Sequence, residues 1–154
     1  MTMWLDVLDL KHYPALRELI AQKGEPGFLS PIGNEGACVE GYVIVRNDGK
    51  LAGCVTFSDY VPGQNVIIHA FIDPDYRCRW IRKSFLKEIA DYAFEVLDVP
   101  KITAFAIEGM TDGMTAFLER IGFQKEGAIR KGIKINGEFH NLILYGLLKE
   151  ERRW

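Results

Sequence analysis

The stretch IDPDYRCRWIRKSFLKEI, residues 72–89, decides the fold, because it joins a strand to an amphipathic helix through a Pro-containing turn. The preceding run NVIIHAFID is apolar and β-branched, which predicts a strand at about residues 65–73. After Ile81 the apolar side chains recur at helical spacing, at Phe85, Ile89, Ala93 and Val96. KITAFAI, residues 101–107, is a second buried strand. A strand, helix, strand unit must cross over, so these two strands are expected to lie parallel in the middle of a mixed sheet.

The flanking sequence supplies the remaining elements of one sheet. MWLDVLDL predicts a strand and residues 9–24 a helix, with Pro14 in its first turn and Gly24 as its stop. Residues 25–36, rich in Pro and Gly, predict a loop. The further predictions are antiparallel strands at about 40–46 and 50–60, a short helix in TDGMTAFLERIG, and a terminal hairpin over residues 123–148 around Asn136 and Gly137. We therefore expect an α/β (α+β) fold, in which a mixed, mostly antiparallel sheet of about seven strands carries helices on both faces.

Composition narrows the class of protein further. A chain of 154 residues that is 48% hydrophobic suits one domain, residues 1–154. The net charge of −2 gives no global reason to expect nucleic acid, although a local basic cluster can still bind it. Charged residues interrupt the apolar residues of Met1–Ile20, so we expect no signal peptide and no membrane-spanning segment, and a cytoplasmic protein. Cys38, Cys54 and Cys78 are unclustered, which predicts reduced thiols and no metal site.

The element order and three motifs resemble a known family. The motifs are IDPDYR before the central helix, FLERIGF, and the tail GFQKEGAIRKGIKINGEFHNLILYGLLKEE. Together they are similar to the GNAT superfamily of acyl-CoA-dependent N-acetyltransferases, and the tail is similar to the branch that acetylates ribosomal-protein N-termini. The resemblance implies a GNAT-like domain with a splayed central parallel strand pair, acetyl-CoA as cofactor, and an amine acceptor on a small molecule, a peptide N-terminus or a lysine.

The family's pyrophosphate loop has a counterpart in this chain, but its glycines are replaced. The family pattern R/Q-x-x-G-x-G/A aligns with Arg77, and Trp80 and Arg82 occupy the two glycine positions. Backbone N–H groups at a helix N-terminus bind an anion whatever their side chains, so a cradle is still expected if Trp80 points outward. Its expected members are Arg77, Cys78, Arg79, Trp80, Ile81, Arg82 and Lys83. If Trp80 points inward the site is blocked, and the alternatives for this stretch are a solvated basic helix start or a patch for another anionic partner.

Other cofactor contacts follow from the resemblance. Phe71 and Ile72 lie where the family's splayed strand hydrogen-bonds the pantetheine arm, although ordinary core alternation explains these two side chains equally well. Thr111 and Phe117, on the short helix, are carried over as further contacts. The family's usual tyrosine acid is replaced by Leu118 in this chain.

Catalysis in this family is direct attack of an amine on the thioester, which needs a base. His69 is the first candidate, since imidazole titrates near neutral pH, although a lone strand histidine is often a packed or surface residue. Glu108 is the second candidate, with a solvated loop carboxylate as the alternative. Ser58, Asp59 and Tyr60 are the predicted substrate-binding residues, with Asp59 holding the ammonium group, or they serve only a turn.

Three functions remain open from the sequence. The first is an acetyl-CoA-dependent N-acetyltransferase. The second is a catalytically reduced member of the same fold that binds a partner through the altered loop. The third is an acyltransferase with another acyl-CoA or with a nucleic-acid base as acceptor. A homodimer is a further expectation, because the terminal hairpin offers an edge strand that a second copy can pair with.

Overall fold

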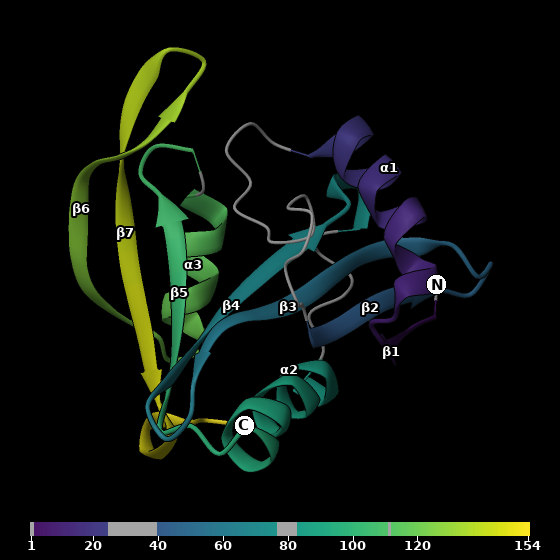
Figure 1. Ribbon diagram of the computed structural model, residues 1–154, viewed down its shortest axis with the longest axis horizontal. Helices are drawn as coiled ribbons and strands as arrows, with labels where there is room; N and C mark the ends of the chain where they lie inside the picture. The colour runs from purple at the N-terminus through teal and green to yellow at the C-terminus, as the bar shows by residue number, and fades with distance from the viewer. Residues whose placement is uncertain (1, 25–39, 77–82, 111) are drawn as a thin grey trace.

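The computed structural model describes residues 2–24, 40–76, 83–110 and 112–154 (Figure 1). These residues form a seven-stranded sheet in the order β1-β2-β3-β4-β5-β7-β6. The strands are β1 (Met3–Val7), β2 (Glu40–Arg46), β3 (Leu51–Val61), β4 (Asn65–Ile72), β5 (Lys101–Ile107), β6 (Gln124–Ile135) and β7 (Glu138–Leu148). The helices are α1 (Tyr13–Lys23), α2 (Lys83–Asp91) and α3 (Asp112–Arg120). The predicted fold class is confirmed.

The sheet opens between β4 and β5, its one parallel pair among the described strands. The pairing covers only Val66 with Ile102 and Ile67 with Thr103. Beyond these pairs the two strands diverge into a V, which Figure 1 shows clearly. Among the described residues, the last ladder pair between β4 and β5 is therefore Ile67 with Thr103. The predicted splayed pair is confirmed.

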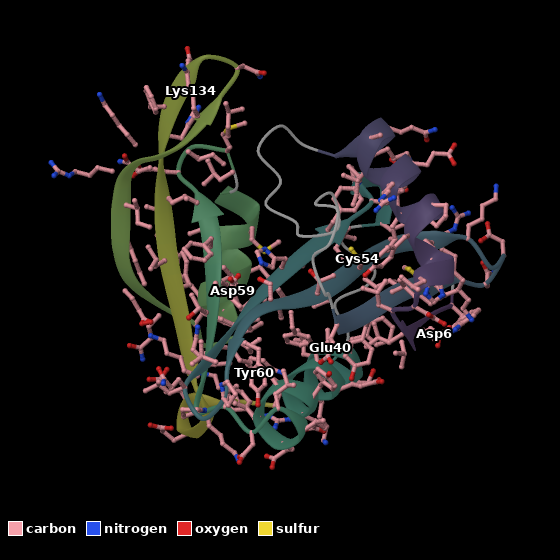
Figure 2. The ribbon with its side chains drawn as sticks, in the orientation of Figure 1. Asp6, Glu40, Cys54, Asp59, Tyr60 and Lys134 are labelled. Carbon is pink, nitrogen blue, oxygen red and sulfur yellow. The ribbon has the colours of Figure 1, made fainter. Side chains whose placement is uncertain are left out.

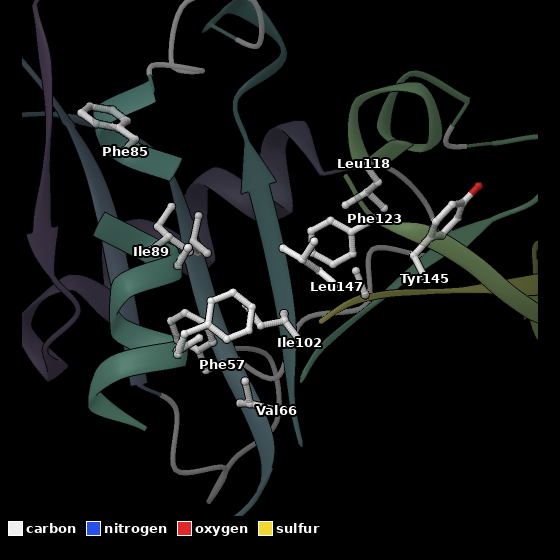
Figure 3. Close-up of a cluster of buried hydrophobic side chains, with 14 of the residues drawn as sticks. Phe57, Val66, Phe85, Ile89, Ile102, Leu118, Phe123, Tyr145 and Leu147 are labelled. Atoms are coloured by element: carbon white, nitrogen blue, oxygen red, sulfur yellow. The ribbon is translucent and has the colours of Figure 1, made fainter. Parts of the chain in front are cut away.

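Helices cover both faces of the sheet, as predicted. Val43 and Val45 of β2 pack with Leu16 of α1. Ile44, between them in the sequence, packs into the cluster that contains Ile89 of α2. Because neighbouring residues of a strand point to opposite faces, α1 and α2 lie on opposite sides of the sheet. The cluster on the α2 side, drawn in Figure 3, also receives residues from α3 and β7.

The turns obey the backbone preferences of their residues. The N–H of Gly24 donates to the carbonyl of Ile20 and closes α1. Asn136 and Gly137 have φ values of 50° and 83°, as a two-residue hairpin turn of type I′ requires. Both features were predicted from the sequence.

The central helix differs from the prediction of one continuous helix through Val96. After Asp91 the chain forms a π turn, Tyr92–Val96, in which the N–H of Leu97 donates to the carbonyl of Tyr92 at 2.9 Å. The Tyr92 hydroxyl also donates to the carboxylate of Glu40 in β2. Helical spacing of apolar residues does not distinguish a π turn from an α turn over so short a segment.

Candidate active site

His69 lies on β4 just beyond the point where β4 and β5 separate. It follows Ile67, the last residue of β4 that pairs with β5, by two positions. Strand alternation places His69 on the same face as Phe71, which packs with Leu16 of α1. The side chain is half-buried. His69 therefore lies on the α1 face of the sheet, opposite to the face that α2 covers.

Ser58 and Asp59, at the end of β3, form a hydrogen-bonded chain with His69. The Ser58 Oγ lies 2.8 Å from His69 Nε2. The same hydroxyl donates to Asp59 Oδ2 at 2.8 Å. Ser58 pairs with Ile67 in the ladder, so His69 is its diagonal neighbour on the same face. The structure thus brings His69, the predicted base, together with Ser58 and Asp59, two of the predicted substrate-binding residues.

A β-bulge makes this arrangement possible. The register of β3 and β4 shifts between Ser58 and Val61, and Asp59 has a φ of 50°. Positive φ is uncommon outside glycine, and aspartate is one of the residues that tolerate it. A bulge commonly redirects a side chain close to a functional site.

Tyr60 does not join this cluster. Its hydroxyl donates to the carbonyl of Leu97 at 3.0 Å, after the π turn. Figure 2 shows Tyr60 beside α2 and apart from Asp59. Tyr60 therefore links the β3–β4 hairpin to the end of the central helix.

The predicted cofactor residues fall into two groups. Phe71 and Ile72 are 3% and 5% exposed, so their side chains belong to the core. Lys83 is the exposed first residue of α2. Arg77, Cys78, Arg79, Trp80, Ile81, Arg82 and Thr111 lie outside the described residues.

An ion pair that the sequence analysis missed anchors the turn after β4. Lys23 Nζ lies 2.9 Å from Asp73 and 2.9 Å from Asp75. Hydrogen bonds to Asp75 and Asp73 raise the pKa of Lys23. Asp73 also accepts from the backbone N–H of Asp75, in the cap position before a 3-10 turn, Pro74–Tyr76. An Asp before Pro at a strand end was the available sequence signal for such a cap.

Glu108 is exposed at the end of β5 and bound to β7. Its carboxylate accepts from the side-chain amide of Asn141 at 2.8 Å. The Asn141 side-chain oxygen accepts in turn from the backbone N–H of Lys131, where the β6–β7 register shifts. These bonds join the terminal hairpin to the end of β5, and the role of Glu108 as a base stays a prediction.

Phe117, the last of the predicted cofactor residues, lies beside the core, and Leu118 and Cys54 lie within it. Leu118 is 5% exposed, and Phe117 is partly buried against the same cluster. Burial raises the pKa of the Cys54 thiol to about 12, so Cys54 is a protonated core residue and a poor nucleophile at neutral pH.

Residues 2–24, 40–76, 83–110 and 112–154 contain neither a membrane-spanning helix nor a metal-binding group of side chains. No helix there is long and apolar enough to cross a membrane. Nor do three or more His, Cys, Asp or Glu side chains gather there in a group suited to a metal ion.

The sheet order, the splayed parallel pair of β4 and β5, and the helices on both faces are the arrangement of the GNAT fold. The model of the Acetyltransferase (GNAT) family matches residues 13–123. The chain belongs to this family.

Curated relatives are found in Bacillus subtilis (strain 168). YdaF, provisionally named a ribosomal N-acetyltransferase, is 33% identical over 106 residues, which are 68% of this chain and 57% of YdaF. YjcK, provisionally named an N-acetyltransferase, is 29% identical over 111 residues, which are 71% of this chain and 61% of YjcK. The matched stretch therefore spans less than two thirds of either relative.

Solved structures share the fold over nearly the whole chain. A crystal structure described as a probable acetyltransferase has a TM-score of 0.78 at 24% identity, covering 97% of this chain and 94% of that chain. Mutant forms of the spermidine/spermine N-acetyltransferase SpeG from Vibrio cholerae have a TM-score of 0.77 at 15% identity, covering 96% of this chain and 94% of that chain. At sequence identities of 24% and 15%, this structural similarity establishes the fold alone.

Proposed function

We propose that the protein transfers the acetyl group of acetyl-CoA to an amine, with His69 as the general base. The observation that carries this proposal is the position of His69, on the α1 face and two residues beyond the last β4–β5 pair. The phosphate end of the donor is assigned to the segment before α2. The helix α2 covers the face of the sheet opposite to His69. A donor that reaches through the V would meet an acceptor on the face that carries the base.

The described residues fit the acetyl donor. A pantetheine arm carries amide groups that need hydrogen-bond partners. The described β4–β5 pairing ends at Ile67 and the strands then diverge, so the diverging part of β4 is assigned to the arm. The backbone of Phe71 and Ile72 is assigned to this role. Lys83, at the start of α2, adds a positive charge for the phosphates, together with Arg77, Arg79 and Arg82 as predicted from the sequence.

The protein's own contribution to the reaction is to position the groups and to move a proton. Acetyl-CoA supplies an activated acyl group, so that a C–N bond forms while the C–S bond breaks and sulfur leaves as thiolate. His69 accepts one proton from the acceptor ammonium group and later releases it to solvent. The second amine proton is transferred to the thiolate. We assign no side chain to that second transfer, because Leu118 carries no titratable group.

The acceptor is proposed only as a class. A peptide N-terminus, a lysine or a small amine all present the ammonium group that the mechanism needs. YdaF is named for a ribosomal acceptor and SpeG for spermidine and spermine, so a ribosomal-protein N-terminal peptide and spermidine are suitable probes. A single domain over residues 1–154, a cytoplasmic location and a homodimer stay predictions from the sequence.

Calorimetric titration with acetyl-CoA, CoA and dephospho-CoA at two salt concentrations tests the donor assignment. We expect saturable binding of acetyl-CoA and CoA that weakens as salt rises, because phosphate contacts are screened. Thiol release with the two probes then tests transfer. A folded protein that binds none of the three nucleotides would contradict the proposal and favour a reduced member of the family with a binding role.

A further inference from the structure

We infer that Ser58 and Asp59 are positioning residues that fix the tautomer and orientation of the His69 ring, so that Nδ1 is the nitrogen that takes the acceptor's proton. The inference rests on the proposed role of His69 as base. It also replaces the expectation from the sequence that Asp59 holds the substrate ammonium.

The assignment follows from counting protons along the hydrogen-bonded chain. An ionised carboxylate only accepts hydrogen bonds, so the single hydroxyl proton of Ser58 is donated to Asp59 Oδ2, 2.8 Å away. The Ser58 oxygen is then the acceptor in its contact with His69 Nε2, also 2.8 Å long. Nε2 must therefore carry a hydrogen. In the neutral ring the basic lone pair consequently belongs to Nδ1.

The same chain supports the protonated ring. When Nδ1 takes a proton, the Nε2–H bond to Ser58 is kept, and the charge of Asp59 lies one hydroxyl group away. The opposite tautomer would set the Nε2 lone pair against the Ser58 oxygen and lose this hydrogen bond. A base held in this way by a further group is a recurring arrangement in enzymes.

The bulge explains how two consecutive residues contribute to one chain. In a regular strand neighbouring side chains point to opposite faces. The φ of 50° at Asp59 breaks that alternation, so its carboxylate turns back to the hydroxyl of Ser58. Asp98, another aspartate with a positive φ (55°), supplies a matched control for the backbone conformation.

Nitrogen-15 NMR of the histidine rings measures the tautomer directly, and His69→Gln assigns the signal. We expect the neutral imidazole ring of His69 to carry its hydrogen on Nε2. Ser58→Ala and Asp59→Asn should each shift the ring to a mixture of tautomers, whereas Ser58→Thr and Asp98→Asn should leave the wild-type signal. A neutral ring protonated on Nδ1, or a tautomer unchanged in both Ser58→Ala and Asp59→Asn, would overturn the inference.

Steady-state thiol release with spermidine or the N-terminal peptide gives the second readout. Ser58→Ala should lower kcat by about tenfold, as loss of a group that orients a functional histidine does, with the KM for acetyl-CoA unchanged and with Ser58→Thr restoring the rate. An unchanged kcat in Ser58→Ala, or a kcat in Ser58→Thr as low as in Ser58→Ala, would also overturn the inference. Failure of wild type to bind acetyl-CoA would instead refute the proposed function, and the NMR result distinguishes the two failures.

Discussion

The carboxylate of Asp73, 3% exposed, lies 2.9 Å from Nζ of Lys23 and joins the end of α1 to the turn that follows β4. Lys23 bonds equally closely to Asp75, whose side chain is 70% exposed. One lysine therefore holds a buried and an exposed carboxylate at the same distance, which allows the effect of burial to be measured within one cluster.

Asp73→Ala should lower the free energy of unfolding by about 2–3 kcal/mol, because it removes hydrogen bonds to a charged group in a buried position. Asp75→Ala, the matched control, should cost less than about 1 kcal/mol, since an exposed ion pair is screened by solvent. Urea unfolding of both variants measures the difference. Equal losses would show that burial of Asp73 adds nothing to the pair.

Gly53→Ala should disturb the half of β4 that is assigned to the donor. A Cβ at Gly53 would lie 2.1 Å from the carbonyl oxygen of Phe71, so β3 and β4 must move apart. We expect a loss of about 1–3 kcal/mol in stability, as in other overpacked sites, together with weaker acetyl-CoA binding. In α3, a Cβ at Gly113 would meet no atom within 4 Å. Gly113→Ala should therefore keep or slightly raise stability, and a loss there equal to that of Gly53→Ala would contradict this account.

Tyr92→Phe should change how stability depends on alkaline pH. Burial, and then the bond to Glu40, raise the pKa of Tyr92 above its ordinary value of 10.0. The folded state thus favours the protonated phenol. This contribution is fully present below pH 10 and is lost as pH rises through the folded pKa. We expect the variant to lose about 1 kcal/mol at neutral pH and to show a shallower fall of Tm above about pH 10. Parallel Tm curves for variant and wild type would contradict the assignment.

Cys54 should resist thiol reagents while the protein is folded. Its pKa of about 12 leaves almost no thiolate at neutral pH, and its side chain is buried. Labelling with Ellman's reagent in a Cys38→Ser/Cys78→Ser background should therefore be slow in buffer and rapid in denaturant. Fast labelling of the folded variant would show that Cys54 is accessible.

The sequence predicted the elements better than the contacts between them. Gly24 and Asn136–Gly137 marked a helix stop and a hairpin turn, because each meets a specific backbone requirement. The chain of Ser58, Asp59 and His69 was not predicted, since it depends on a bulge that breaks the alternation on which strand predictions rest. Tyr60 was grouped with Ser58 and Asp59 because the three are consecutive at a strand end, whereas its hydroxyl bonds to the carbonyl of Leu97. The Lys23–Asp73 pair joins residues fifty positions apart, which local patterns do not reveal.

The most direct test compares acetyl transfer by wild type, His69→Gln and His140→Gln, the last being a control at another half-buried strand histidine. The measurement is thiol release from acetyl-CoA with spermidine or the N-terminal peptide as acceptor. If His69 is the base, His69→Gln should bind acetyl-CoA as wild type does and lose about 100-fold or more in kcat, while His140→Gln keeps the wild-type rate. A wild-type kcat in His69→Gln would contradict the central claim.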